Sequence, residues 1–554
     1  MALYAAAAIV AAQIVAAGVA QPPANGHERC RKTTVAILGG GVAGITAAQA
    51  LSNESISDFL ILEYQDRIGG RAHHTTFGKK QDGSPYTVEL GANWARGSRA
   101  PGFRVLENQE AQVRLTPPWC LVRQAFGKHQ SQKAQIFKAK KHGVANHASD
   151  DESLLTYDHG GYNDYSNLMA AYQEASAKAH EQAGRMLANN EQDQTFRTGL
   201  SLAGWNPSHS NMTAHAVEYF GWDWDASLPP ERSSHIFGAA GNNLTFGYFS
   251  PDNLFVTDQR GYSAFVEGEA STFLKAHDKR LLLKTQVTKI DYSEQGVTVH
   301  NADGSCVSAA YAICTFSLGV LQSSVIAYQP QLPEWKQQSI HKFDMGTYTK
   351  IFLQFNQTFW PSDKQYLLYA SPTTRGYYPV WQSLSTEGFM PGSNIIFATV
   401  TNKESYRIEQ QSDEETKREV LAVLGDMFPN TTIPEPTAFM YPRWTQTAWA
   451  RGSYSNWPPS TTLQMHQNLR ANLGRLWFAG EATSAEFFGY LHGAWFEGRQ
   501  AGAQIASLLR GRCAVVWAGQ AECGARPHYQ QLHGTTPLSE YNLLNGWAVS
   551  SLGE

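Results

Sequence analysis

Cysteine and charge are both scarce in this sequence, and each shortage argues against a class of protein. The 554 residues include only six cysteines, too few for a fold built on disulfides. No Cys-x-x-Cys pair and no histidine cluster has the spacing of metal ligands, so we expect no bound metal. Charged residues make up 17 % and apolar residues 42 %, which is typical of a large globular core and not of a disordered chain. A net charge of −4 provides no overall basic surface, and this argues against nucleic acid as a partner.

The spacing of four cysteines leaves their pairing open. Cys513 and Cys523 are close enough in sequence to form a disulfide behind the last helix. Cys306 and Cys314 flank a strand-like stretch and are equally compatible with buried free thiols.

The first twenty residues contain no charged side chain and end in the small-residue sequence GVA. This ending is typical of cleavage by signal peptidase after Ala20. A single membrane anchor is the alternative, but the run is rich in alanine and short for one. We therefore expect residues 1–20 to be a signal peptide, the mature protein to be secreted, and no stable association with a membrane. Five Asn-x-Ser/Thr triplets are compatible with a glycoprotein, at Asn53, Asn211, Asn243, Asn356 and Asn430.

The chain is too long for one ordinary domain, and its N-terminal part has the order of a dinucleotide-binding unit. A β-rich apolar run at residues 33–38 leads into the glycine turn GGGVAG, and an Ala-rich helical stretch follows at 45–51. A second apolar run at 59–62 ends at Glu63, nineteen residues after Gly44. This order predicts a βαβ unit: a strand, a glycine turn, a helix, a second strand and an acidic residue.

The three glycines of this turn are expected to have different tasks. Gly39 permits the tight turn, Gly41 lets the backbone approach a pyrophosphate, and Gly44 lets the helix pack on the strand. The helix N-terminus then stabilises the phosphate charge. Glu63 is expected to accept hydrogen bonds from the adenosine ribose. An ordinary surface glutamate at a strand end is the alternative, and this unit alone does not separate FAD from NAD.

Other stretches show clear local patterns. Residues 163–190 have helical composition, and residues 281–315 alternate as strands do, with Asp303 and Gly304 as a turn. Residues 349–355 form another strand-like run. Residues 128–151 are polar and rich in Lys and His, so we expect an exposed loop, with a basic patch for an acidic partner as the alternative. After Cys513 the pattern fades into a tail rich in Gly, Gln and His.

Motifs after the βαβ unit identify a resemblance that covers roughly residues 33–512. They are RIGGR (67–71), VELGANW (88–94), FDMGTYTKIF (343–352), RGYY (375–378), RIEQQSD (407–413), GSYSNWP (452–458), FAGEAT (478–483) and GYLHG (489–493). In these motifs the sequence resembles the flavin-containing amine oxidase family, and within it the secreted polyamine oxidases of plants.

The resemblance implies a fold of two domains. One is an α/β, Rossmann-like FAD-binding domain built from residues 33–110, 254–325 and 440–512. The other is an α+β substrate-binding domain built from residues 111–253 and 326–439, and residues 513–554 form a C-terminal tail.

The resemblance also assigns the cofactor contacts. Arg71 would meet the FAD pyrophosphate, since a guanidinium fork suits paired phosphate oxygens. The backbone of Val287 would contact adenine, and Glu481 would hold the ribityl chain. Family members with covalent flavin have a cysteine at the position of Ser453, so we expect non-covalent FAD. The remaining cofactor-binding candidates are Ala92, Trp94, Trp444 and Trp449.

Lys350 resembles the active-site lysine that holds a water against flavin N5 in this family. The residues themselves support this interpretation, because Tyr348, Lys350 and Phe352 share one face of a strand and place the lysine among aromatics. Desolvation there would lower its pKa. The alternative is a lysine that extends to solvent. Tyr454 and Tyr490 resemble the aromatic pair that flanks the substrate amine and stabilises its positive charge.

One position departs from the family pattern. The resembled polyamine oxidases surround the substrate tunnel with carboxylates. Asp225 stands where members have Glu, but Arg96 stands where an acid is expected. A cation there would repel a polyamine by about 1 kcal/mol or more if partly desolvated. The alternatives are that Arg96 pairs with Asp225 or with a carboxylate of the substrate.

Taken together, the sequence predicts an FAD-dependent oxidase of small-molecule amines, with polyamines (spermine or spermidine) as the leading class. A neutral amine would lose hydride from its α-carbon to flavin N5, the imine would hydrolyse to an aldehyde and an amine, and O₂ would be reduced to H₂O₂. One alternative is an oxidase of an amino acid or biosynthetic amine that uses Arg96 as a carboxylate clamp. A second is a non-catalytic flavoprotein that keeps FAD for folding, against which Lys350, Tyr454 and Tyr490 argue. The sequence leaves the oligomeric state open.

Overall fold

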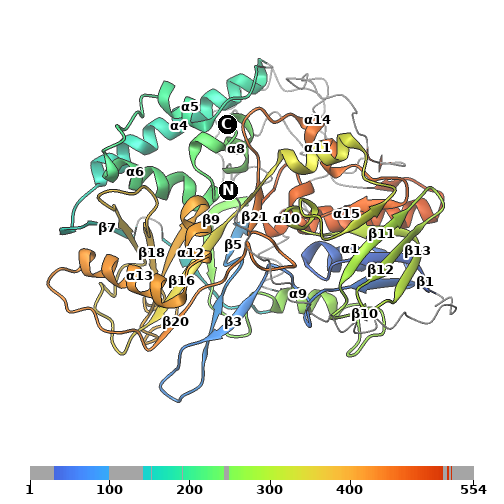
Figure 1. Cartoon of the computed structure of the whole chain (residues 1–554), viewed down its shortest axis with the longest axis horizontal. Coiled ribbons are helices and arrows are strands. Elements are labelled where there is room, and N and C mark those ends of the chain that lie inside the picture. Colours follow the sequence, from blue (N-terminus) through green and yellow to red (C-terminus); the bar gives the residue numbers. More distant parts are fainter. Residues whose placement is uncertain are drawn as a thin grey trace, which may run out of the picture.

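The computed structural model describes residues 30–98, 141–150, 153–189, 191–242, 249–515, 521–522 and 526. Figure 1 shows two groups of sheets and helices with short strands between them. The expected signal peptide lies outside the described residues, as do Cys120, Cys523 and Asn243. No described helix is both long and apolar enough to cross a membrane.

The first sheet has eight strands, and β1 and β13 pair in parallel at its centre. Its order is β10-β2-β1-β13-β12-β11-β14, with β22 also paired to β13. The strands are β1 (Arg31–Leu38), β2 (Phe59–Leu62), β10 (Leu281–Leu282), β11 (Val287–Tyr292), β12 (Val297–Asn301), β13 (Cys306–Cys314), β14 (Ala327–Gln329) and β22 (Leu476–Phe478). Helices α1 (Val42–Asn53) and α15 (Leu491–Leu509) pack against each other beside this sheet (Figure 1).

Three separate stretches of the chain build this first sheet. The sequence predicted the strands at 33–38 and 59–62, the helix at 45–51 and the alternation over 281–315, and the structure has an element at each of these places. Strand β2 and the second half of β1, residues 35–38, are apolar and fully buried, as is typical of a parallel sheet covered on both faces. The division of the chain into a three-part FAD-binding domain and a two-part substrate-binding domain stays a prediction. Strand β14 would extend the second part of the FAD-binding domain to residue 329.

The second sheet has the order β20-β16-β19-β18-β17-β7-β8. Its strands are β7 (Leu154–Asp158), β8 (Gly161–Tyr162), β16 (Tyr348–Gln354), β17 (Tyr366–Tyr369), β18 (Val380–Ser383), β19 (Ile395–Thr401) and β20 (Ala438–Met440). All seven residues of β16 are buried, so the strand predicted at 349–355 is a central strand of this sheet, shifted by one residue. Around it lie α4 (Ser166–Ala188), α5 (Phe196–Leu202), α6 (Met212–Glu218), α12 (Asn402–Glu409) and α13 (Asp413–Met427) (Figure 1).

Smaller elements join the two groups. Three short sheets are formed by β3 (His74–Phe77) with β4 (Tyr86–Glu89), by β15 (Asp344–Gly346) with β21 (Tyr454–Asn456), and by β5 (Trp94–Ser98) and β6 (Asn146–Ser149) on either side of β9 (Phe249–Val256). The short helices are α7 (Trp224–Ala226), α8 (His235–Asn242), α9 (Ala264–Ala270), α10 (Leu318–Leu321), α11 (Glu334–Lys342) and α14 (Leu463–Arg470). A last hairpin pairs β23 (Ala514–Val515) with β24 (Ala521–Glu522).

The prediction of an exposed loop over residues 128–151 is wrong near the C-terminal end of this range. Residues 146–149 form β6, whose register places Asn146 opposite Val256 and Ser149 opposite Asn253. A polar strand of four residues has no hydrophobic alternation, and only its partner β9, far along the chain, reveals it. Residues 128–140 lie outside the described residues.

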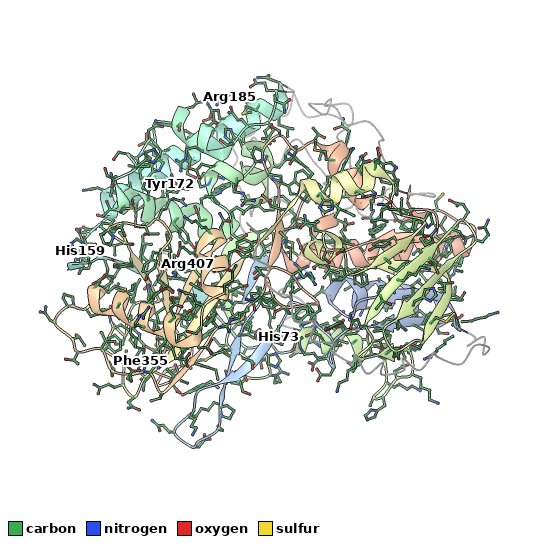
Figure 2. All side chains as sticks on the ribbon, in the orientation of Figure 1. His73, His159, Tyr172, Arg185, Phe355 and Arg407 are labelled. Atoms are coloured by element: carbon green, nitrogen blue, oxygen red, sulfur yellow. A yellow bond between two sulfur atoms is a disulfide. The ribbon has the colours of Figure 1, made fainter. Side chains whose placement is uncertain are left out.

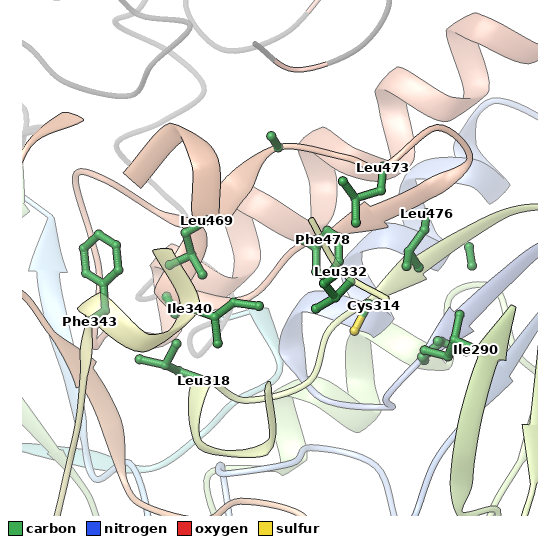
Figure 3. Close-up of a cluster of buried hydrophobic side chains, with 14 of the residues drawn as sticks. Ile290, Cys314, Leu318, Leu332, Ile340, Phe343, Leu469, Leu473, Leu476 and Phe478 are labelled. Atoms are coloured by element: carbon green, nitrogen blue, oxygen red, sulfur yellow. The ribbon is translucent and has the colours of Figure 1, made fainter. Parts of the chain in front are cut away.

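The cysteines divide between bonded and free forms. Cys30 and Cys306 form a disulfide that ties the start of β1 to the start of β13, with Cα atoms 4.6 Å apart. Cys314, at the end of β13, is a buried free thiol among Ile290, Leu332 and Phe478 (Figure 3). The free-thiol interpretation is therefore confirmed for Cys314 and wrong for Cys306. Cys513 is also disulfide-bonded.

Candidate functional site

A cavity of about 410 Å³ lies at the carboxyl ends of β1, β2, β13 and β22, where the residues after these strands meet. Ligands of open α/β sheets bind at this edge. Every candidate residue whose side chain the structure describes lines the cavity except Gly44. The predicted cofactor and substrate residues therefore share one space, although they come from stretches up to about 450 residues apart.

The glycine turn has three different environments. Gly39 has a φ of +115°, and a Cβ atom there would meet Thr315 Oγ1 at 2.4 Å. A Cβ at Gly44 would lie 1.9 Å from the Gly39 carbonyl oxygen, inside the contact between helix and strand. At Gly41 the nearest protein atom to a Cβ would be 3.8 Å away, and the residue faces the cavity. Gly41 is therefore a glycine that the protein's own packing does not require.

Glu63 is buried at the end of β2 and faces the glycine turn. Its carboxylate accepts hydrogen bonds from the Gly40 N–H at 2.6 Å and the Gln65 N–H at 2.8 Å. Burial is the main influence on its pKa and raises it, while these hydrogen bonds oppose the rise. The side chain lines the cavity, so the alternative of a surface glutamate is wrong.

Arg71 and Glu481 form an ion pair, with Arg71 Nη1 2.9 Å from Glu481 Oε1. The same nitrogen donates to the Ser453 carbonyl at 2.9 Å, and Glu481 also accepts from the Gly489 N–H at 2.8 Å. Residues from two distant parts of the chain, one at Arg71 and one at residues 453–489, are thereby fixed together at the cavity. The guanidinium keeps further donors for an anion.

Aromatic rings form another part of the wall. Trp444 and Trp449 meet edge to face with centroids 5.8 Å apart. His73 contacts both rings edge to face, with centroids 6.3 and 6.0 Å away, and lies near the middle of the view in Figure 2. Burial lowers the pKa of His73 to about 4, so it is neutral at physiological pH. Val287, at the start of β11, lines the cavity beside Thr285 and Gln286.

Lys350 projects from β16 and is only 1 % exposed, so the alternative of a lysine that extends to solvent is wrong. Its Nζ donates to the carbonyl oxygens of Glu89 at 3.0 Å and Gly91 at 2.8 Å. Nζ also lies 5.5 Å from the centroid of the Trp94 ring. Burial lowers the pKa of Lys350 to about 7, and the negative charge of Glu89 opposes this shift. A lysine of this kind exchanges its proton near neutral pH.

Two tyrosines are fixed at the cavity by hydrogen bonds to main-chain oxygens. The Tyr454 hydroxyl donates to the Asp225 carbonyl at 2.8 Å, and the Tyr490 hydroxyl donates to the Gly241 carbonyl at 3.4 Å. The rings of Tyr348 and Tyr454 lie 6.1 Å apart. Burial raises the pKa of Tyr454 well above its ordinary value, so its hydroxyl keeps its proton. The cavity therefore presents aromatic faces, which attract cations.

The segment that carries Asp225 begins with one turn of π-helix at Tyr219–Asp223. Arg375 holds this turn, since its Nη1 and Nη2 each donate to the Asp223 carboxylate at 2.7 Å, and its Nη2 also donates to Glu218 at 2.9 Å. Both acids are almost fully buried. Turns of π-helix are frequent at functional sites, and this one delivers Trp224 and Asp225 to the cavity.

Arg96 lies in β5, where its backbone pairs with that of Asn253. Asn253 lines the cavity. The side chain of Arg96 lies outside the described part of the chain, so the interpretations of its charge stay predictions.

The sequence reasoning did not single out Glu89 or Trp224. Glu89 is a lone acid between two apolar residues in the VELGANW motif, and that position was an available signal. Trp224 contacts Trp94 edge to face at 5.8 Å. Its position in the cavity wall depends on the π-helical turn, and hydrophobic periodicity in the sequence does not predict such a turn.

The residues at the cavity match FAD. Gly41 faces the cavity although the protein's own packing does not require a glycine there. A buried acid, Glu63, follows the second strand of the βαβ unit, and Arg71 adds a positive charge. In the described residues, no group of three or more His, Cys, Asp or Glu side chains is placed to hold a metal ion. The expected absence of a metal remains a prediction.

Comparisons with known proteins agree with this geometry. The family described as flavin containing amine oxidoreductase matches residues 42–506. Polyamine oxidase 1 of Zea mays is 37 % identical over 482 residues, covering 84 % of this chain and 88 % of that protein. Polyamine oxidase 7 of Oryza sativa subsp. japonica is 37 % identical over 481 residues, covering 84 % and 93 %.

A solved structure shares the fold. Wild-type putrescine oxidase bound to putrescine has a TM-score of 0.62 at 18 % identity, over 86 % of this chain and 99 % of that chain. The expected family is confirmed, and so is the expected fold of two domains, one of which binds FAD. The chain therefore belongs to the family of flavin-containing amine oxidoreductases and is an FAD-dependent amine oxidase.

Proposed function

We propose that the physiological substrates are polyamines such as spermine and spermidine. When bound, FAD would accept hydride from the carbon next to the amine nitrogen and pass the electrons to O₂, which yields H₂O₂. The imine product then hydrolyses to an aldehyde and a shorter amine. The observation that carries the proposal is the 37 % identity to two plant polyamine oxidases over 84 % of this chain.

The chain's own residues would prepare the amine for this reaction. The faces of Tyr454 and Tyr490 would flank the nitrogen and stabilise positive charge on it, and Tyr348 would extend this surface. Asp225 would attract the distant ammonium groups of a polycation. Lys350 would hold a water near the reacting carbon and exchange a proton with it. Its lowered pKa supports this role.

The remaining contacts would fix the cofactor. Gly39 would permit the tight turn, Gly41 would admit the pyrophosphate, and Gly44 would keep the helix packed on the strand. Arg71 would pair with the pyrophosphate, and Glu63 would accept from the ribose. Val287 and Glu481 would hold the adenine and ribityl ends. Ala92, Trp94, Trp444 and Trp449 would enclose the flavin.

The test is a panel of amines supplied to the purified enzyme, with peroxide release as the measurement. Spermine and spermidine should give the highest kcat/KM, with the diamine putrescine lower and L-amino acids inactive. Higher activity on an amino acid or another carboxylated amine would favour the alternative in which Arg96 clamps a carboxylate. A protein that releases no peroxide with any amine, and whose flavin is not bleached anaerobically, would be the non-catalytic alternative.

Arg96 provides a specific prediction within this proposal. If its charge opposes polyamine entry, Arg96→Glu should lower the KM for spermine or spermidine with a smaller change in kcat. The gain should shrink at high salt, because exposed charges are screened over about 8–10 Å. Steady-state peroxide assays at two ionic strengths measure it.

Two other outcomes of the Arg96 experiment have distinct meanings. A carboxylate clamp predicts that Arg96→Glu abolishes activity on a carboxylated amine while the flavin stays bound. An unchanged KM for every amine tested would mean that Arg96 does not act on substrate at all.

The FAD of the wild-type enzyme should be released by acid precipitation. Ser453 has no thiol to form a thioether, and its hydroxyl accepts from the Tyr348 N–H at 2.9 Å. Yellow colour should therefore appear in the supernatant, measured by absorbance. Colour retained in the pellet would contradict non-covalent binding.

Secretion is the proposed localisation. The Cys30–Cys306 disulfide supports it, because disulfides persist in oxidising compartments. The triplet asparagines Asn53, Asn211, Asn356 and Asn430 are exposed, as glycosylation requires. N-terminal sequencing of the mature protein should begin at Gln21, and a start at Met1 would contradict cleavage.

A further inference from the structure

The main chain around Glu89 holds the amine of Lys350. Two of the three donors of the Lys350 ammonium go to the carbonyls of Glu89 and Gly91, at 3.0 and 2.8 Å. Lys350 also lines the cavity, so the third donor is available to a ligand or water there. The orientation of this amine therefore depends on the end of β4 and the turn after it.

The side chain of Glu89 is also buried, at 5 % exposed, and its carboxylate acts on Lys350 through space rather than in a direct ion pair. One carboxylate oxygen, Oε1, accepts from the Tyr262 N–H at 2.6 Å. The other, Oε2, has no hydrogen-bond partner among the described residues. A half-satisfied carboxylate is costly to bury, and a neighbouring positive charge is the main way to offset that cost.

We propose that Glu89 is a positioning residue that sets the charge of Lys350: its carbonyl orients the amine, and its buried carboxylate favours the ammonium form. The proposal rests on the proposed role of Lys350 at the reacting carbon. It extends that role, because it names the group that determines whether Lys350 is an acid or a base at working pH. Removal of the carboxylate charge should make Lys350 release its proton more readily.

The pKa shifts agree with this arrangement. Burial raises the pKa of Glu89 to about 7 and lowers that of Lys350 to about 7, and the attraction between the two opposes both shifts. A pair of this kind changes its proton content as one unit near neutrality. The other ionisable groups around Glu89 are Arg67, Asp258, Tyr262 and His74.

Arg67 and Asp258 act on Glu89 in opposite directions, and the arginine lowers its pKa while the aspartate raises it. The hydroxyl of Tyr262 keeps its proton, because burial raises its pKa. The pKa of His74 is lowered, mainly by burial, so the ring is neutral near pH 7. Among the cations that line the cavity, Lys350 is therefore the one whose pKa the Glu89 carboxylate raises.

The experiment measures the titration of Lys350 directly in the holoenzyme without an amine substrate. Cyanate reacts only with the neutral amine, so its incorporation into the Lys350 peptide, followed by mass spectrometry across pH, gives the pKa. Glu89→Gln keeps the acceptor for the Tyr262 N–H but removes the charge. We expect it to shift the Lys350 profile by about 1 pH unit or more to the acid side.

A second readout is the pH dependence of the reaction of photoreduced enzyme with O₂, which also needs no amine. The part of this rate-against-pH curve that depends on Lys350 should move to lower pH in Glu89→Gln, by the same amount as the cyanate profile. Glu89→Asp should stay closer to the wild type because it keeps the carboxylate. Neither readout requires that polyamines be the substrate, so failure of the proposed function is distinguishable from failure of this proposal.

Glu269→Gln is the matched control, since Glu269 is a carboxylate that is 1 % exposed and contacts Gln49, Lys141 and His142 instead. It should leave the Lys350 profile unchanged. If Glu89→Gln does not fold, the reciprocal measurement uses Lys350→Met, which should raise the pKa of the Glu89 carboxyl in infrared difference spectra. A Lys350 profile unchanged in Glu89→Gln, or a Glu89 titration unchanged in Lys350→Met, would overturn the proposal.

Discussion

Lys350→Met should retain FAD but slow turnover about a hundredfold, the range for the loss of a positioned acid–base group. This corresponds to about 2.7 kcal/mol in the activation barrier. Methionine has a similar volume, so the buried position of residue 350 in β16 remains filled. The lost groups are the amine donors, two of which hold the carbonyls of Glu89 and Gly91. Stopped-flow absorbance with amine, and then with O₂, separates the two half-reactions.

Lys336 offers a matched control for this substitution. It is also fully buried, and its Nζ donates to the carbonyls of Leu469 and Ala471, but it does not line the cavity. Lys336→Met should therefore lower the melting temperature while the turnover per bound FAD stays near that of the wild type. If Lys350→Met carries out both half-reactions at wild-type rates, Lys350 has only a structural role.

The pH dependence of turnover follows from the same group. Lys350 titrates near pH 7, so its ammonium form is lost as the pH rises through that value. A step that needs the ammonium slows above pH 7, and a step that needs the free amine slows below it. If Lys350 serves as an acid in one half-reaction and as a base in the other, the rate of the first should fall above pH 7 and the rate of the second should fall below it.

Local sequence was enough for the parts of the fold that local forces determine. The βαβ unit was predictable because Gly39 needs a positive φ and Gly44 needs a close contact, which other residues do not allow. The strand that carries Lys350 was predictable from its alternation. Such features are encoded within one continuous stretch of the chain.

Other features depend on partners far along the chain, and the sequence alone did not show them. Cys306 pairs with Cys30, 276 residues away, and spacing cannot select that partner. Strand β6 exists because β9 supplies its hydrogen bonds. The charge of Lys350 depends on Glu89, 261 residues before it, and on how deeply both are buried. The site residues were recognisable singly, whereas the electrostatics between them arise only from the tertiary structure.

Gly41→Val should give a folded protein without FAD. A Cβ at Gly41 would be 3.8 Å from its nearest protein neighbour, and the backbone there has a φ of −73°, which any residue adopts. Valine is a poorer N-cap for α1 than glycine, at a cost of about 1 kcal/mol. The larger effect is on the cofactor, since the side chain would occupy the space through which the pyrophosphate approaches. Absorbance of the purified protein measures the flavin, and circular dichroism measures the fold.

Two further variants make the result specific. Gly44→Ala places a Cβ 1.9 Å from the Gly39 carbonyl oxygen, so it should destabilise the packing of α1 on β1 and give little soluble protein. Glu63→Ala removes the ribose acceptor but leaves the phosphate path open, so it should lose FAD less completely than Gly41→Val. Melting temperatures must be compared with wild-type apoprotein, because bound FAD itself stabilises the folded state. Full FAD content in soluble Gly41→Val would mean that the pyrophosphate does not pass this glycine, and the assignment of the turn would then be wrong.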